Sequence, residues 1–158
     1  MFRDIRKKKN RIDEAAAKAL LRTERRGVLA MYGMEDYPYA IPINYYYDEE
    51  KQRICFHSAR AGHKADALAA CDKVCFTVYG HEEAREEAWA PYMQSVVLFG
   101  RCRPITDQEE KLAALRLFGN KYYPDSTLVE EEISADGRAV QMYEILIEHL
   151  SGKEVQEK

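Results

Sequence analysis

The sequence lacks long hydrophobic runs and any excess of basic residues. Its longest apolar segments, such as residues 95–100, are far too short to cross a bilayer, so we expect no membrane contact. The net charge is −3, from 24 basic and 27 acidic residues. Nucleic-acid binding needs surplus positive charge, so we expect no nucleic-acid partner.

The one basic cluster lies near the N-terminus, between Arg3 and Arg11. It is interpreted as a solvated lead-in to a helix, with a phosphate-binding arm as the alternative. No apolar segment follows it, so a secretory leader is not indicated and the predicted location is cytoplasmic.

The four cysteines form no CxxC pair. A zinc site built from Cys55, His57, Cys71 and Cys75 would match no structural zinc spacing, so we predict no metal. Cys55 and Cys102 lie in apolar strand-like runs, where a thiol behaves as a small hydrophobic group.

The chain also lacks internal repeats, low-complexity segments and linkers rich in Pro, Gly or Ser. Its 158 residues are enough for one domain with its own core. We therefore predict a single domain over residues 1–158, with a flexible lead-in over 1–12 and a flexible tail over 152–158.

Runs rich in β-branched and aromatic residues predict six strands, over residues 27–32, 39–47, 53–58, 73–79, 92–103 and 140–150. Pro42 cannot donate a ladder hydrogen bond, so its strand is expected at an edge or a bulge. Gly100 is expected at a bend. Short loops between consecutive strands favour antiparallel pairing and closure into a barrel.

Three short helices are predicted over residues 13–26, 62–71 and 106–119. Asp13 is the expected N-cap of the first helix. Thr106 with Glu109 forms a capping-box pattern, and Gly119 is expected to end that helix. Residues 80–91 are predicted to form a loop or a short helix, and residues 122–136 to be irregular. The fold class is therefore mainly β, a barrel with a few helices.

The chemically informative segment is residues 54–68, which read ICFHSARAGHKADAL. A strand leads through the hydroxyl of Ser58 and the flexible Gly62 to a helix start that carries Lys64, with Arg60 nearby. The first turn of a helix exposes unpaired N–H groups and partial positive charge, so this arrangement suits a phosphate. The alternative is that the cations only face water. Neither a Walker loop nor a Rossmann glycine pattern is present.

Four motifs in order resemble the FMN-binding split β-barrel family. They are YPYAIPINY, then FHSA with Gly62 and Lys64, then VCFTV, and then SVVLFGRC before a helix. The chain resembles most the nitroimidazole-resistance-type flavoproteins, which are relatives of pyridoxamine 5′-phosphate oxidase. The resemblance covers residues 19–153 and implies a split barrel that binds FMN.

The resemblance also implies site residues. Along the flavin ring it implies Pro42, Ile43, Asn44 and Tyr45. Near the ribityl phosphate it implies His57, Ser58, Ala59, His63 and Lys64, and it leaves open which histidine contacts the phosphate. From the neighbouring subunit of a homodimer it implies Gln94 and Ser95.

The chain has His63 where oxidase-type relatives carry arginine, and no C-terminal segment that would grip pyridoxamine phosphate is evident. The implied function is therefore an FMN-dependent oxidoreductase that passes electrons from a small donor to a small organic acceptor, with no catalytic residue assigned. The alternative is a non-catalytic module that binds FMN, haem or a deazaflavin as a carrier or sensor.

Aromatic residues leave further alternatives open. The sequence has eleven tyrosines. They serve strand packing or form a wall beside a planar ligand. Trp89 packs on the barrel or covers the flavin, and Tyr122 and Tyr123 are candidates to close the substrate side.

Overall fold

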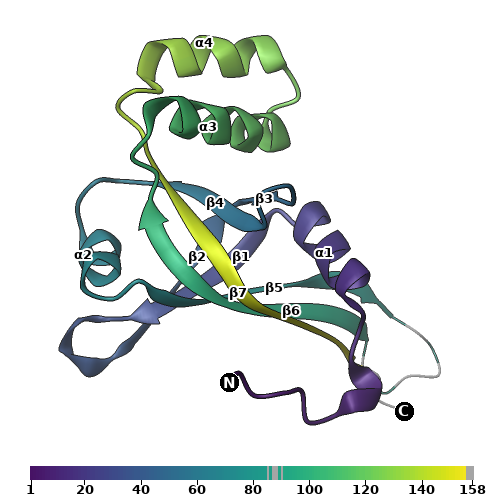
Figure 1. Ribbon diagram of the computed structural model, residues 1–158. Helices are drawn as coiled ribbons and strands as arrows, with labels where there is room; N and C mark the ends of the chain where they lie inside the picture. The colour runs from purple at the N-terminus through teal and green to yellow at the C-terminus, as the bar shows by residue number, and fades with distance from the viewer. Residues whose placement is uncertain (85, 87–88, 90, 156–158) are drawn as a thin grey trace.

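Seven strands form one antiparallel sheet in the computed structural model, which describes residues 1–155 except 85, 87, 88 and 90 (Figure 1). The strands are β1 (Arg26–Tyr32), β2 (Pro38–Asn44), β3 (Tyr46–Asp48), β4 (Arg53–Ser58), β5 (Lys73–Glu83), β6 (Tyr92–Pro104) and β7 (Gln141–Val155). Their order across the sheet is β2-β1-β5-β6-β7-β4-β3. The predicted mainly β, antiparallel fold is confirmed.

The sheet curls around an apolar core. Alternate residues of each strand face the same side of the sheet, and those on the inner side are buried in this core. Leu29, Phe76 and Leu98 from three adjacent strands are all fully buried there. Helix α1 (Glu14–Thr23) adds Leu20 and Leu21 to the same core. The helix therefore closes one side of the curled sheet.

The remaining helices are α2 (His63–Ala70), α3 (Gln108–Tyr122) and α4 (Ser126–Asp136), with short 3₁₀ turns at Lys8–Asn10 and Met34–Asp36. Asp13 caps α1 as predicted, since its carboxylate accepts from the Ala16 N–H at 2.8 Å. The helix ends earlier than predicted because Arg26 already belongs to β1. No described helix has the length and apolar character needed to span a membrane.

The predicted strand over residues 39–47 is two strands, separated at Tyr45. Pro42 lies in β2, the strand at one end of the sheet, which confirms the expected edge position. The predicted bend at Gly100 is also confirmed, since the pairing of β6 with β7 shifts register between Phe99 and Gly100. A Cβ at Gly100 would come within 2.2 Å of the Leu146 carbonyl oxygen, so this close approach requires glycine.

Helices α3 and α4 form a hairpin that stands above the barrel (Figure 1). The predicted irregular segment over residues 122–136 is wrong, because most of it is α4. Gly119 does not end α3 but lies inside it, where a Cβ would come within 2.7 Å of Val129. Glycine is therefore needed for helix contact. Asp107, not Thr106, caps α3, and it accepts from the Glu110 N–H at 2.8 Å.

Both terminal segments lie against the sheet. Residues 152–155, predicted as tail, continue β7, and Arg11 bridges to Lys153. The ring of Phe2 stacks on His149 at a centroid distance of 4.8 Å. Residues 156–158 of the predicted tail lie outside the described residues, as do four positions of the predicted loop over 80–91, of which 80–83 belong to β5.

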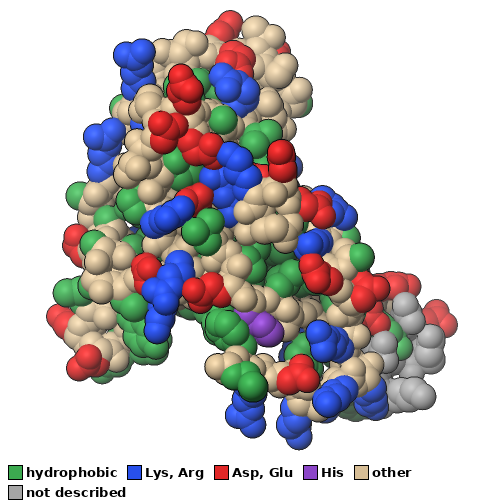
Figure 2. Space-filling model, in the orientation of Figure 1, with side chains coloured by type: hydrophobic (Ala, Val, Ile, Leu, Met, Phe, Trp, Pro, Cys, Tyr) green, Lys and Arg blue, Asp and Glu red, His purple; other side chains and the backbone are tan. Residues whose placement is uncertain are grey.

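Acidic and basic side chains are interspersed over the face shown in Figure 2. One ion-pair network is buried. The Arg53 side chain is only 5% exposed and contacts Asp48 at 2.9 Å and Glu144 at 2.7 Å, both of which are less than a tenth exposed. It also contacts Glu110 of α3 at 2.5 Å. Arg53 therefore joins β3, β4, β7 and α3.

Replacing Arg53 with alanine is expected to lower the free energy of unfolding by about 3–5 kcal/mol, because the buried Asp48 carboxylate loses its cation and Glu144 keeps only the exposed Arg103. The control is Arg101→Ala, since Arg101 also pairs with two carboxylates but is 44% exposed. The control substitution should lower the free energy of unfolding by less than about 1 kcal/mol. Urea unfolding followed by circular dichroism measures both, and equal losses would contradict the assigned role of Arg53.

Candidate flavin-binding site

The start of α2 has an uncapped first turn. Gly62 precedes the helix with a φ of 113°, a backbone conformation that favours glycine, and no heavy atom beyond its chain neighbours lies within 4 Å of where a Cβ would stand. No side chain caps the helix. The N–H groups of the first turn therefore remain available to a ligand.

Lys64 and His57 lie close enough to influence each other. The Lys64 Nζ lies 5.5 Å from the centroid of the Phe56 ring. Burial lowers the pKa of Lys64. Partial burial also lowers the pKa of His57, and the positive charge of Lys64 lowers it further. The structure thus brings together two residues that were predicted from separate positions of one motif.

His63 is held in a different way. Its ring stacks on Tyr39 of β2 at a centroid distance of 4.1 Å and an interplanar angle of 10°. Its Nε2 lies 3.5 Å from the Met34 N–H. His63 therefore connects the start of α2 to β2 and to the β1–β2 connection.

The predicted residues of β2 divide between two faces. Pro42 and Asn44 lie on the outer face, whereas the side chains of Ile43 and Tyr45 are buried in the core. Only backbone groups of Ile43 and Tyr45 are therefore available to a ligand outside the barrel. Ser58 at the end of β4 is half-buried and Ala59 is exposed, and both lie just before the α2 start.

Tyr45 is fixed by contacts that the sequence did not predict. Its hydroxyl donates to the Leu21 carbonyl at 2.9 Å, and its backbone N–H donates to the Tyr122 hydroxyl at 2.8 Å. The Tyr122 hydroxyl also lies within hydrogen-bond distance of the Tyr45 and Arg25 carbonyls. Tyr122 at the end of α3 thus holds the break between β2 and β3.

Gln94 and Ser95 lie away from the other predicted residues. They belong to the part of β6 that pairs with the end of β5, whereas α2 leads into the beginning of β5 (Figure 1). Gln94 contacts His81 at 3.1 Å and Glu154 at 3.2 Å. Within one chain, Gln94 and Ser95 do not join the site at α2.

A cavity of about 770 Å³ lies on the outer face of β1, β5 and β6. None of the eleven predicted site residues lines it. The residues that do include Phe2, Ala30, Tyr32, Cys75, Phe99 and Arg101. Among the described residues, no three His, Cys, Asp or Glu side chains gather as a metal site would require.

A family model described as pyridoxamine 5′-phosphate oxidase matches residues 13–154. The chain belongs to this family. The match spans α1 to β7 and so includes every predicted site residue. No curated protein matches the chain.

Solved structures share the fold of this pyridoxamine 5′-phosphate oxidase family member. A candidate 5-nitroimidazole antibiotic resistance protein from Bacteroides thetaiotaomicron is 21% identical, with a TM-score of 0.75, over 91% of this chain and 86% of that one. An FAD-binding protein from Mesorhizobium loti is 23% identical, with a TM-score of 0.65, over 92% and 97%. The flavocytochrome Anf3 from Azotobacter vinelandii is 22% identical, with a TM-score of 0.75, over 95% and 71%.

The contact between Tyr122 and Tyr45 gives a test of how this family member positions its site. Tyr122→Phe removes the acceptor of the partly buried Tyr45 N–H and should lower the free energy of unfolding by roughly 1–3 kcal/mol. Tyr123→Phe is the control, because Tyr123 is 60% exposed. Equal unfolding midpoints in urea for the two variants would contradict this role of Tyr122.

Proposed function

We propose that the protein binds FMN beside β2 and the start of α2 and acts as an oxidoreductase on small organic acceptors. The observation that carries this proposal is the uncapped α2 start, with Gly62 in its unusual conformation and Lys64 beside His57. The family match supports the proposal, as does the similarity to an FAD-binding protein and to a flavocytochrome.

The donor set of the α2 start fits a flavin phosphate. No described carboxylate forms an ion pair with Lys64, so its charge is available to an anion. The first-turn N–H groups and the Ser58 hydroxyl add neutral donors. Asp66 also lies in the first turn, so the site depends on Lys64 for its positive charge.

Each remaining part of the proposed site has a defined task. The outer edge of β2, with Pro42 and Asn44, would lie along the flavin ring and orient it. His57 would hold or release a proton near the phosphate end, with its pKa kept low by desolvation and by the charge of Lys64. When bound, the flavin supplies the redox chemistry, and the chain supplies position, charge and exclusion of water.

We further propose a homodimer in which the second copy supplies Gln94 and Ser95. Residues on the outer faces of β1, β5 and β6 are apolar and only partly covered, as at Val28, Ala30 and Val97. The inner faces of the same strands form the core. Strands that are apolar on both faces are typical of sheets covered on both sides.

FMN binding is tested through Lys64. After incubation with FMN and desalting, the wild-type protein should show flavin absorbance bands, and Lys64→Gln should weaken FMN binding at least tenfold, because a charge-assisted contact is worth roughly 1.5–3 kcal/mol. The control is Lys73→Gln, which removes a lysine just beyond the other end of α2. No flavin on the wild-type protein would refute the proposal.

Parallel incubation with FAD decides between the two flavins. FMN retention with tighter binding than FAD supports the proposal, whereas FAD retention alone would overturn the choice of FMN. A flavin that is retained but not reduced by any nicotinamide donor would instead assign a carrier or sensor role.

The shared site is tested by mixing variants. Lys64→Gln and Gln94→Ala homodimers should each bind FMN weakly, because every site lacks one contact. Refolding a mixture should create heterodimers with one intact site, and these should bind FMN with wild-type affinity at half the wild-type stoichiometry. No recovery on mixing would show that Gln94 and Lys64 do not act on one flavin across two chains.

A further inference from the structure

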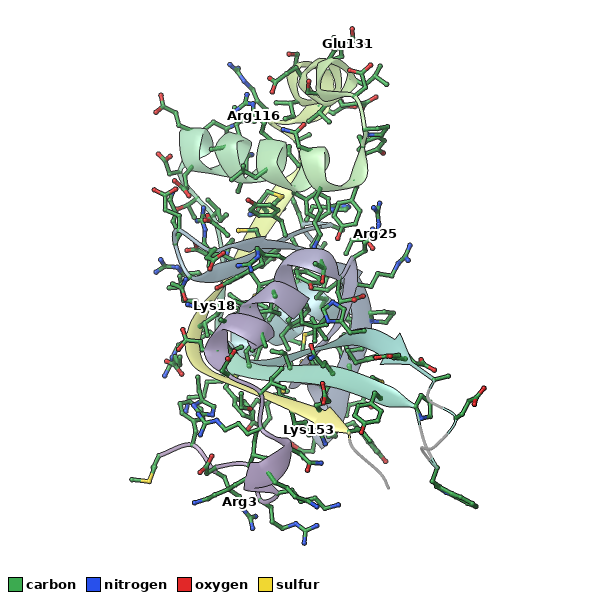
Figure 3. All side chains as sticks on the ribbon, turned by 90° about the vertical axis from the view of Figure 1, so that its right-hand side faces the viewer. Arg3, Lys18, Arg25, Arg116, Glu131 and Lys153 are labelled. Carbon is green, nitrogen blue, oxygen red and sulfur yellow. The ribbon has the colours of Figure 1, made fainter. Side chains whose placement is uncertain are left out.

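Three cations gather where α1 leads into β1 and where α3 ends. They are Arg25, Arg26 and Lys121. The Arg25 guanidinium carbon lies 4.9 Å from the centroid of the Tyr122 ring, and the Lys121 Nζ lies 5.8 Å from the same centroid. The Lys121 Nζ also lies 4.1 Å from the centroid of the Tyr45 ring. In Figure 3, Arg25 stands at the level between the barrel and the α3–α4 hairpin.

No described carboxylate forms an ion pair with any of these three cations. The Lys121 ammonium donates to the Glu24 backbone carbonyl, while the Glu24 carboxylate lies against Gly80. Burial, with repulsion from Arg25, lowers the pKa of Lys121 to about 8. The corner therefore holds a surplus of positive charge on a chain whose net charge is −3.

The cations adjoin the proposed flavin site. Arg26 pairs directly with Asn44 across β1 and β2. Lys121 covers the ring of the next residue, Tyr45, and Tyr122 fixes that residue's backbone. The cluster thus lies at the end of the strand along which the flavin ring is proposed to rest, whereas Lys64 lies at the α2 start.

We propose that Arg25, Arg26 and Lys121 form a second anion site, which binds the carboxylate or phosphate of the small molecule that reacts with the flavin. The proposal rests on the proposed function for its purpose, but binding of the anion does not require flavin. Two arginines and a partly buried lysine without carboxylate partners provide the charge-assisted donors that such a group needs. Both Arg25 and Lys121 contact the Tyr122 ring, so their charged groups lie near each other.

The proposal is tested by NMR titration of the ¹⁵N-labelled full chain, saturated with FMN, with inorganic phosphate and with acetate as probes. Phosphate or acetate should shift the backbone amides of Gly27 and Tyr45. The shifts should weaken at least tenfold in apparent affinity in an Arg25→Gln, Arg26→Gln double variant and in Lys121→Met. The probe that binds more tightly identifies the preferred anionic group, and either preference supports the site.

Arg22→Gln is the matched control. Arg22 lies three residues before Arg25, near the end of α1, but it is paired with Glu49 at 2.6 Å. It should leave the probe shifts unchanged. The double variant keeps the Tyr45–Tyr122 hydrogen bonds, so an unchanged FMN affinity shows that it is folded. Probe shifts that persist in the charge variants, or that occur only at Gly62, would overturn the proposal.

The pH dependence of probe affinity tests whether the charge of Lys121, rather than its packing, binds the anion. The groups that face Lys121 are Glu24, Arg25, Tyr45 and Tyr122. Below its pKa Lys121 is charged, so the affinity of the wild-type protein for acetate, whose own charge is constant over this range, should fall as pH rises from 7 to 9. The fall should be absent in Lys121→Met, and a wild-type affinity that stays constant over this range would contradict the role of Lys121.

If the wild-type protein binds no FMN, the same titration is repeated on the flavin-free Lys64→Gln variant. Shifts at Gly27 and Tyr45 would then support the anion site even though the proposed flavin function had failed. Absence of shifts at both residues, in the presence of normal FMN binding, would reject the anion site alone.

Discussion

The guanidinium of Arg53 makes contacts on which the geometry of the site depends. It lies between Asp48, Glu144 and Glu110, which come from β3, β7 and α3. Hydrogen bonds from Lys51 and Arg53 hold the pKa of the Glu110 carboxyl below its usual range. Glu110 is therefore an anion at neutral pH, and its pairing keeps the first turn of α3 on the sheet.

The C-terminal end of α3 contacts residues of the proposed flavin site. Phe118 packs its ring edge-on against His57 at 5.1 Å, and Tyr122 holds the backbone of Tyr45. A helix that shifted along the sheet would disturb both contacts together. Charge pairing at one end of α3 and hydrogen bonding at the other thus set the relation between β4 and the end of β2.

Local sequence patterns predicted most of the strands and the helix start that carries Lys64. Alternating residues, the edge proline Pro42 and the bulge at Gly100 act over a few neighbouring residues, so a sequence reveals them. The contact between Tyr122 and Tyr45 joins residues 77 positions apart. No local signal marks a hydroxyl that bonds to a distant backbone, so this part of the site could not be predicted.

Helix α4 was missed for a related reason. Of its residues only Val129 is buried, so the segment shows no apolar stripe of helical period. Its contact with α3 relies on Gly119, which in isolation signals the end of a helix. Gly119 therefore led to a wrong predicted end for α3, and its role in the contact between α3 and α4 was not recognised.

The pairing of β7 has a consequence for synthesis of the protein. This strand lies between β6 and β4, and these two strands do not pair with each other. A ribosome that has completed β6 and α4 thus holds a chain in which the edges of β6 and β4 that pair with β7 are still unpaired and the core is incomplete. Because β7 is the seventh strand in chain order, the sheet can be completed only after β7 is synthesised, and until then the two edges that β7 will cover are open to pairing with other chains.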